Sequence, residues 1–439
     1  MRGRFQEPRR HISLRTVLIA LGVLVLAAAA FGVWKFTRPA PLPEIAVPVM
    51  QSQPVETPAQ PEAQAPSETP EAPAARELEA DVVEQTPPEP AGQSLRLMAV
   101  GDDLIHNSIY WSAELPDGSY DFTPFYQDIA PVVAEYDLAC IQQETIFVSD
   151  PALYDNYPRF ASPTAVGDAL AQAGFNVVTM AGNHCYDKGM TGITDTLSFW
   201  REQHPDVTVL GIHDSQEDAD TIRVVEQNGL RVALLDYTYG VNYEKPENAW
   251  TVDFLDRDKA ARDLENARAQ ADFVIVFAHW GEEGEFSPND YQRDWAEFFA
   301  AQNVDAVIGG HPHVVQRADW LEGTNQFGEA QRTLCVYSLG NFLSGQCQNG
   351  RDGGVIFQLA LKEDEGRIAV DSFSFVSTWV WRTGTERAGY TYSVLPVSRY
   401  RETPLKDMTQ RDRTAMLECD RRNCQTLASG SAVVEELSE

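Results

Sequence analysis

Two of the eight histidines in this chain of 439 residues, His311 and His313, lie two positions apart in the segment GGHPHVVQ. They follow DAVI at 305–308, an apolar run of the length expected for a buried strand. Neutral imidazole is a common metal ligand, and its pKa near neutrality suits proton transfer. A single histidine beside a core is often only a hydrogen-bonded structural group, so the meaning of this pair depends on what else reaches the same place.

Polar residues directly follow several other apolar runs, and these residues are Asp102, Glu144, Asn183 with His184, and His279. In α/β proteins the carboxyl ends of the strands carry the site, because the loops there converge on one crevice. Each residue alone has a structural explanation, such as a helix N-cap, a turn or a core hydrogen bond. Gathered together, three histidines, two carboxylates and one carboxamide would lack partners without a cation.

The types of these side chains narrow the choice of cation. None is a thiolate, so the set suits Mn, Fe or Zn better than Cu(I) or an iron–sulfur cluster. Six candidate ligands exceed the four that a tetrahedral zinc needs. Paired ions about 3.5–4 Å apart activate water and hold both oxygens of an in-line displacement at phosphorus. We therefore expect two divalent metal ions (Mn, Fe or Zn) that share one carboxylate.

The pattern after residue 93 predicts an α/β layer fold, because short apolar runs alternate with amphipathic stretches. The predicted strands are 95–100, 137–142, 175–180, 207–210, 230–237, 273–278, 305–309 and 334–339. The predicted helices are 164–173, 192–202, 256–271 and 290–302. QNG at 227–229 predicts a hairpin turn before the strand that begins at Leu230.

The sequence resembles the CapA family of poly-γ-glutamate capsule-synthesis proteins over about residues 95–380. The motifs that carry this resemblance are AVGDDLIH, IQQET, TMAGNHCYDKG, FAHWGEE, IGGHPHVVQ and YSLGNF, in that order. The family is similar to the calcineurin-like metallophosphoesterases. The resemblance implies a four-layer α/β/β/α sandwich, which we expect to occupy residues 94–400.

The resemblance also implies a role for each candidate residue. Asp102 and His313 would bind the first ion, Glu144 would bridge, and the second ion would be bound by Asn183, His279 and His311. His184 would face the substrate and protonate the leaving group or stabilise charge on the phosphoryl oxygens, with Asp187 orienting it. We expect Pro312 to fix the bend between the paired histidines and the two preceding glycines to let the chain turn.

The chain departs from the family pattern in two places. Where the family usually has NLE, this chain has QQE, so Gln142 replaces an asparagine while Glu144 is kept. The Asp-x-His pattern of phosphoesterases is absent after the first strand. His106, four residues beyond Asp102, is a possible metal or substrate ligand if the loop folds back, and a solvent-facing side chain otherwise.

The N-terminus has the pattern of a membrane anchor. Residues 1–15 contain five arginines and precede eighteen residues, Val17–Trp34, without a polar side chain. As a helix these would span about 27 Å, close to the roughly 30 Å hydrocarbon core. The basic flank predicts a cytoplasmic segment at 1–15, a single-pass anchor at 16–36 and an extracellular C-terminal domain at the cell membrane. A cleaved signal peptide ending near Ala27–Ala30 is the alternative.

Composition defines two further segments. Residues 37–93 are rich in proline and glutamate, which predicts a disordered linker, and residues 401–439 are predicted to form a charged tail, either a peripheral helix or disordered. The net charge of −31 argues against a nucleic-acid partner, since such binding needs basic patches. Three of the six cysteines lie in or beside predicted strands and are interpreted as buried thiols, whereas Cys419 and Cys424 are close enough in sequence to form a pair.

Three functional hypotheses follow from the site and the resemblance. The first is a membrane-anchored extracellular CapA-like protein that acts on a phosphoester while an anionic wall polymer is made or exported, with polymer-synthesis membrane proteins as partners. The second is a non-catalytic scaffold of the same complex, and the third is an amide hydrolase acting on polyglutamate or peptidoglycan. The presence of every expected ligand favours chemistry, because an abandoned site is free to lose ligands. An acidic surface repels a polyanion except at a cationic metal centre.

Overall fold

The computed structural model describes residues 94–324, 328, 330–364, 367–385, 389–432 and 434–437. These residues belong to one compact unit. The expected basic N-terminus, membrane anchor and linker, at 1–15, 16–36 and 37–93, lie outside the described residues. Within the described part of the chain, no helix has both the length and the apolar composition to cross a membrane.

The first β-sheet combines parallel strands that end at the site with a long antiparallel extension. Its spatial order is β14-β13-β12-β1-β2-β3-β4. The parallel members are β1 (Ser94–Leu104), β2 (Leu138–Gln143), β3 (Val177–Thr179) and β4 (Thr208–Leu210), and β11 (Asn341–Ser344) also pairs parallel with β1. The antiparallel members are β12 (Gly353–Asp364), β13 (Arg367–Thr385) and β14 (Gly389–Pro396).

The second sheet has the order β5-β6-β7-β8-β10-β9. Its parallel members are β6 (Leu230–Thr238), β7 (Phe273–His279), β8 (Ala306–Gly310) and β10 (Ala330–Val336), and its antiparallel edges are β5 (Arg223–Gln227) and β9 (Ala318–Thr324). The predicted hairpin turn is confirmed between β5 and β6. Asn228 and Gly229 both have positive φ, at 53° and 78°, as a type I′ turn requires.

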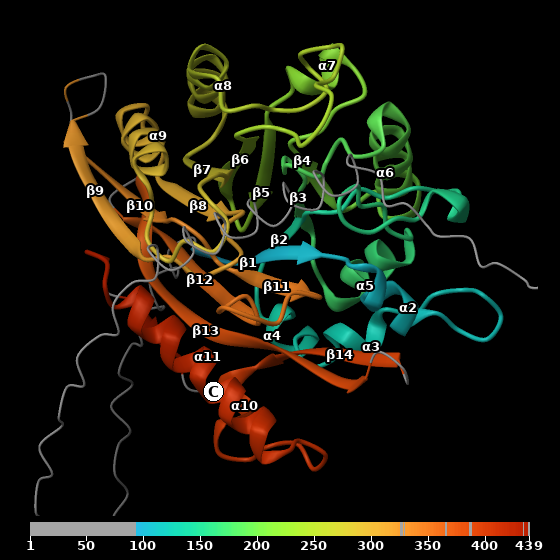
Figure 1. Cartoon of the computed structure of the whole chain (residues 1–439). Helices are drawn as coiled ribbons and strands as arrows, with labels where there is room; N and C mark the ends of the chain where they lie inside the picture. The colour runs from blue at the N-terminus through green and yellow to red at the C-terminus, as the bar shows by residue number, and fades with distance from the viewer. Residues whose placement is uncertain are drawn as a thin grey trace, which may run out of the picture. The chain divides into compact units, whose positions relative to one another are not determined.

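The two sheets face one another across a shared apolar core. On β1, Leu97 and Ala99 point into this core, whereas Met98 and Val100 point to the opposite face. That outer face is covered by α2 (Asn107–Ala113), α3 (Thr123–Tyr126), α4 (Ala130–Val133), α5 (Ala165–Ala173) and α6 (Gly189–Gln203). The outer face of the second sheet packs against α8 (Arg257–Gln270) and α9 (Asp290–Ala301) (Figure 1). The expected α/β class is confirmed, and the layers follow the order α/β/β/α.

Each strand and helix predicted from the sequence is present within a few residues of its expected bounds. Both faces of the central strands are buried, which makes their sequences continuously apolar and easy to recognise. The prediction lacked β12, β13 and β14. Much of β13 is only partly buried and alternates polar and apolar residues, so it carries a weaker signal.

The segment 401–439, expected as a charged tail, contains a helix that packs into the domain. Helix α11 (Gln410–Leu427) places Met416 and Cys419 against Trp379 of β13, next to α10 (Val397–Arg401). The buried face of α11 also carries polar groups: Asn423 donates to the carbonyl of Gly354 at 2.9 Å, and Asp420 pairs with Arg401. These polar residues hide the apolar periodicity of the helix. The six cysteines are free thiols, including Cys419 and Cys424, which both lie on α11.

Beyond β4, a buried histidine joins two acidic side chains. His213 contacts Asp218 through Nδ1 at 3.2 Å and Asp253 through Nε2 at 2.9 Å. Burial alone would lower the pKa of His213, but the two aspartates outweigh it and raise the pKa to about 9. His213 is therefore a charged link between the helix α7 (Gln216–Ala219) and the segment that follows β6.

We expect this link to make stability depend on pH. A histidine whose pKa is higher in the folded state contributes its full stabilisation below its unfolded pKa near 6.5, and loses it as pH rises toward about 9. The stability difference between wild type and His213→Gln should shrink by up to about 3 kcal/mol between pH 6 and pH 9.5. Urea denaturation at several pH values measures this difference, and a constant difference would contradict the assignment.

Candidate metal centre

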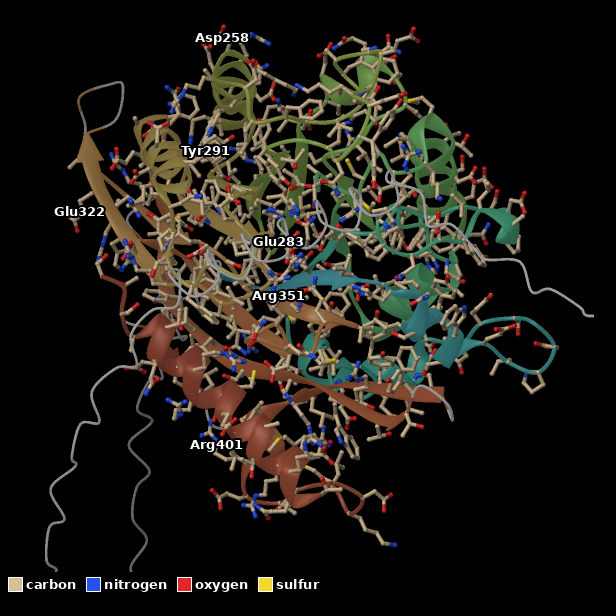
Figure 2. The ribbon with its side chains drawn as sticks, in the orientation of Figure 1. Asp258, Glu283, Tyr291, Glu322, Arg351 and Arg401 are labelled. Carbon is tan, nitrogen blue, oxygen red and sulfur yellow. The ribbon has the colours of Figure 1, made fainter. Side chains whose placement is uncertain are left out.

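The predicted ligands meet where strands of both sheets end. Asp102 lies on β1, Glu144 follows β2, Asn183 follows β3, His279 ends β7, and His311 with His313 follows β8. All of these side chains are buried. Figure 2 labels two residues near this edge, Glu283 and Arg351, whose side chains form an ion pair at 3.0 Å. The topology therefore gathers residues more than 200 positions apart in sequence, as the contact between Asp102 and His313 shows.

One group of potential ligands consists of Asp102, Glu144 and His313, whose ligand atoms all lie within 4.8 Å of one another. Nδ1 of His313 is 2.9 Å from Oδ2 of Asp102 and 3.8 Å from Oε2 of Glu144. The same nitrogen is 3.0 Å from Oδ1 of Asn341, the first residue of β11. Asn341 thus borders this group from the neighbouring strand.

A second group consists of Glu144, His279 and His311, again with ligand atoms within 4.8 Å of one another. Oδ1 of Asn183 lies 2.8 Å from Nε2 of His279, so the amide borders this group. Glu144 belongs to both groups. The arrangement is the one expected of two cation positions on either side of a shared carboxylate.

Unpartnered polar atoms test whether these residues fit metal ions. Both carboxylate oxygens of Glu144, Nδ1 of His279 and Nδ1 of His311 are buried and lack a hydrogen-bond partner among the described residues. A buried polar group without a partner costs about 1–3 kcal/mol, and a buried charge costs more. Divalent cations would satisfy all four atoms at once. The donor set therefore fits a metal centre.

The pKa shifts of the two histidines in the second group agree with this fit. Burial raises the pKa of Glu144 well above its usual value, with His313 opposing the shift and Asp102 adding to it. Burial and the charge of His313 lower the pKa of His311 to about 3, and burial lowers the pKa of His279. His279 and His311 are thus neutral and keep a free lone pair, as metal ligands must.

The backbone of GGHPH differs from the sequence interpretation. Gly309 and Gly310 lie within β8, and the bend comes from the histidines themselves, since His311 has φ 92° and His313 has φ 59°. A Cβ on Gly309 would lie 2.0 Å from the carbonyl oxygen of Tyr337, and one on Gly310 would lie 2.9 Å from Oδ1 of Asp102. The glycines therefore permit close approach. Left-handed backbone at non-glycine residues is strained and clusters at functional sites.

His184 lies beside the second group, outside both sets of ligands. Its Nδ1 is 2.6 Å from Oδ2 of Asp187, which also accepts a hydrogen bond from the backbone N–H of Phe160 at 2.7 Å. The ring of Phe160 meets that of His184 edge-on at 4.7 Å. Asp187 and Phe160 thus restrain the imidazole on two sides, and Asp187 lies where the family resemblance implied, in position to orient His184.

His106 is half-buried and belongs to neither group of ligands. Its Nδ1 accepts a hydrogen bond from the backbone N–H of Gly345 at 3.2 Å, and its ring packs on Phe160 at 5.1 Å. Burial lowers the pKa of His106 to about 4. Gln142, the other departure from the family pattern, accepts a hydrogen bond from the hydroxyl of Thr179 at 2.9 Å.

Two residues of the segment that follows β6 were missed by the sequence reasoning. The ring of Tyr239 lies 4.8 Å from that of His311, and its backbone N–H donates to the carbonyl of His279 at 3.0 Å. Asn242 donates from its backbone to the carbonyl of Asn183 and contacts the ring of His184 with its side chain. Tyr239 follows a strand end just as the predicted ligands do, so the same rule would have found it.

The two groups predict a divided response to mutation. We expect Glu144→Gln to lose both ions, since it removes the shared charge, whereas His313→Ala empties mainly the first position and His311→Ala mainly the second. Metal content after dialysis, measured by inductively coupled plasma mass spectrometry, checks this. His204→Ala is the control, because His204 pairs with Asp168 on the surface of the outer helices. Equal losses in both histidine variants would contradict two separate positions.

Comparison with known proteins identifies relatives over the same region. The chain is 30% identical over 204 residues to the PGA biosynthesis protein CapA of Bacillus subtilis (strain 168), covering 46% of this chain and 51% of that protein. It is 28% identical over 209 residues to the capsule biosynthesis protein CapA of Bacillus anthracis, covering 46% and 48%. The chain thus spans about half the length of the curated relatives it matches.

Solved structures with some similarity include the calcineurin-like phosphoesterase YfkN from Bacillus subtilis, with a TM-score of 0.38 and 13% identity over 77% of this chain and 99% of that one. The 5'-nucleotidase from Candida albicans SC5314 has a TM-score of 0.34 and 11% identity over 76% and 58%. Similarity at this level assigns no activity. A family model, described as the bacterial capsule synthesis protein PGA_cap, matches residues 96–346, which is more than half of the sequence. The chain therefore belongs to the PGA_cap family of bacterial capsule synthesis proteins.

Proposed function

We propose that this protein is a membrane-anchored, extracellular CapA-like protein whose dinuclear metal centre acts on a phosphoester during the synthesis or export of a poly-γ-glutamate capsule or a related anionic wall polymer. The observation that carries the proposal is Glu144, a buried carboxylate without a hydrogen-bond partner among the described residues, shared by two groups of ligands. Family membership supplies the biological setting.

The side chains present suit two divalent ions of the Mn, Fe or Zn type. One position would be bound by Asp102, Glu144 and His313, and the other by Glu144, Asn183, His279 and His311. Oxygen and imidazole donors without a thiolate favour these metals. When bound, such a pair supplies an activated water and positive charge at the phosphoryl oxygens.

Proton transfer to the leaving group is assigned to side chains of the protein. Asp187 holds Nδ1 of His184 at 2.6 Å, which leaves Nε2 as the nitrogen able to exchange a proton with a substrate oxygen. The edge contact with Phe160 keeps the imidazole in one plane. We assign His184 the donation of a proton to the leaving group, and Asp187 its orientation. Asn242, which touches both Asn183 and His184, supports the same geometry.

The surroundings of the site bear on substrate and location. A chain with a net charge of −31 repels polyanions at most of its surface, so an anionic polymer would be attracted only at the cationic centre. The same charge argues against nucleic acid as a partner. We place the centre outside the cell, tethered by the apolar segment 16–36 and the linker 37–93, with polymer-synthesis membrane proteins as its partners.

We expect the full-length protein in detergent to bind about two metal equivalents and to hydrolyse bis(p-nitrophenyl) phosphate or p-nitrophenyl phosphate when Mn²⁺ is added. His184→Ala should lower kcat by about 10²- to 10⁴-fold, the usual contribution of a general acid, without changing the metal content. His204→Ala should behave as wild type. If two ions bind, neither ester turns over and His184→Ala leaves capsule production unchanged, the protein is a non-catalytic scaffold.

A further inference from the structure

One buried carboxylate outside the metal centre connects the two sheets just behind it. Asp236 lies on β6 of the second sheet, two residues before the strand ends at Thr238, and is 1% exposed. Its Oδ2 reaches the first sheet, where it accepts hydrogen bonds from the backbone N–H groups of Met180 and Ala181 at 2.8 and 2.7 Å. Both amides belong to the segment that leaves β3, directly before Asn183 and His184.

The contact leaves little room for adjustment. A Cβ on Gly211 would lie 2.4 Å from Oδ2 of Asp236 and 2.6 Å from the nitrogen of Ala181. The Met180 amide also reaches the carbonyl of Leu210 at 3.1 Å, whereas Asp236 is the only hydrogen-bond acceptor found for the Ala181 amide among the described residues. Removal of the Asp236 carboxylate would therefore leave the Ala181 N–H buried without a partner.

The same strand also fixes ligands of the second sheet. β6 pairs in parallel with β7, and in this register Asp236 lies opposite Phe277 and Thr238 opposite His279. The one carboxylate thus holds the segment that carries Asn183 to the strand pair that carries His279. Oδ1 of Asn183 and Nε2 of His279, which come from different sheets, lie 2.8 Å apart.

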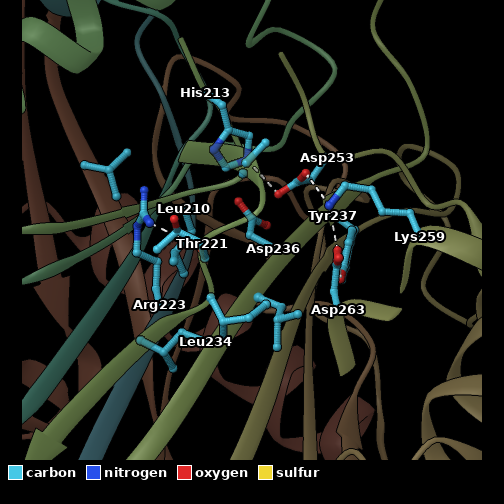
Figure 3. Close-up of a pocket in the computed structure, with 15 residues that line it drawn as sticks. Leu210, His213, Thr221, Arg223, Leu234, Asp236, Tyr237, Asp253, Lys259 and Asp263 are labelled. Carbon is cyan, nitrogen blue, oxygen red and sulfur yellow. Dashed lines mark hydrogen bonds and ion pairs between the residues drawn. The ribbon is translucent and has the colours of Figure 1, made fainter. Parts of the chain in front are cut away.

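The other oxygen of Asp236 borders a small polar chamber. Its Oδ1 has no hydrogen-bond partner among the described residues. Figure 3 shows Asp236 beside His213 and Asp253, and Asp253 forms an ion pair with Lys259 at 3.0 Å. The chamber has a volume of about 30 Å³, enough for a water molecule, and its lining includes cationic and acidic side chains, among them Lys259 and Asp253. Burial raises the pKa of Asp236 well above its usual value, while the N–H groups of Ala181 and Met180 oppose the shift.

We propose that Asp236 is a positioning residue of the metal centre, which ties the segment 180–184 to the second sheet and so sets Asn183 and His184 against His279 and His311. The inference rests on the proposed dinuclear centre. It goes beyond that proposal because Asp236 touches no ligand side chain and belongs to neither group.

Three substitutions separate positioning from simple stability. Asp236→Leu keeps the approximate shape and removes the acceptor. Asp236→Asn keeps one oxygen, which can accept both N–H bonds as Oδ2 does. Asp236→Glu keeps the charge but moves the oxygen by one methylene group. The control is Asp305→Leu, because Asp305 is a partly buried carboxylate that pairs with Arg268 and accepts the N–H of Val274 at 2.7 Å at the opposite end of β7.

The measurement is a titration of each metal-free, full-length variant with Co²⁺, followed by visible absorption and by metal content. We expect Asp236→Leu and Asp236→Glu to bind one ion about 10- to 100-fold more weakly than wild type and the other ion normally, as found for residues that orient ligands. Asp236→Asn should restore affinity to within a few-fold of wild type. Asp305→Leu should lower the melting temperature and bind both ions as wild type does.

The outcomes distinguish this inference from the proposed function. If wild type binds two ions and the folded Asp236 variants bind both with wild-type affinity, the positioning role is wrong while the dinuclear centre stands. Equal weakening in Asp236→Leu and Asp305→Leu would reduce Asp236 to a general stabilising residue and also overturn the role. If wild type binds no ion, the proposed centre and this inference both fail. If Asp236→Leu does not fold, the metal affinity of Asp236→Glu decides between these outcomes.

Discussion

The architecture of the site depends on a buried carboxylate to which none of the described residues donates a hydrogen bond. Glu144 is fully buried, both of its oxygens lack a hydrogen-bond partner among the described residues, and its burial raises its pKa. Protein interiors rarely tolerate such a group without a compensating charge. His279 and His311 on one side are neutral, whereas His313 on the other side has a raised pKa and is shared with Asp102, so divalent cations bound on both sides would supply the remaining compensation. Two groups of ligands meeting at one carboxylate explain why the surrounding residues are placed as they are.

The two sheets together hold the Glu144 carboxylate between ligands that come from different sheets. The first sheet supplies Asp102, Glu144 and Asn183, and the second supplies His279, His311 and His313. Close approach of the sheets is made possible where a side chain would collide, as at Gly310 of the second sheet, where a Cβ would lie 2.9 Å from Oδ1 of Asp102 on the first. The strained φ values of the paired histidines are tolerated because strands of both sheets fix the chain around them. Geometry of this kind is stable only when the core between the sheets is complete.

The sequence identified site residues best where a polar residue directly follows a buried strand. Strand ends with a polar residue after an apolar run identified Asp102, Glu144, Asn183 and His279, because parallel strands must end at one edge. The resemblance to the CapA family implied that Asp187 orients His184, and the two side chains lie 2.6 Å apart. Tyr239 directly follows β6 and was overlooked although the strand-end rule applies to it, whereas Asn242 lies farther along the loop and has a common residue type. Asn341 belongs to the motif YSLGNF, and the parallel pairing of β11 with β1 brings it beside the ligands. For residues 401–439 the sequence left a peripheral helix and disorder both open, because Asp420 and Asn423 on the buried face of α11 interrupt the apolar pattern.

Anomalous X-ray diffraction from crystals grown with Mn²⁺ or Zn²⁺ would test whether two cations share Glu144. We expect two anomalous peaks about 3.5–4 Å apart, one on each side of the Glu144 carboxylate. The first should lie nearest Asp102 and His313, and the second nearest His279 and His311. A single peak away from Glu144, or no peak while both Glu144 oxygens accept hydrogen bonds from the protein, would contradict it.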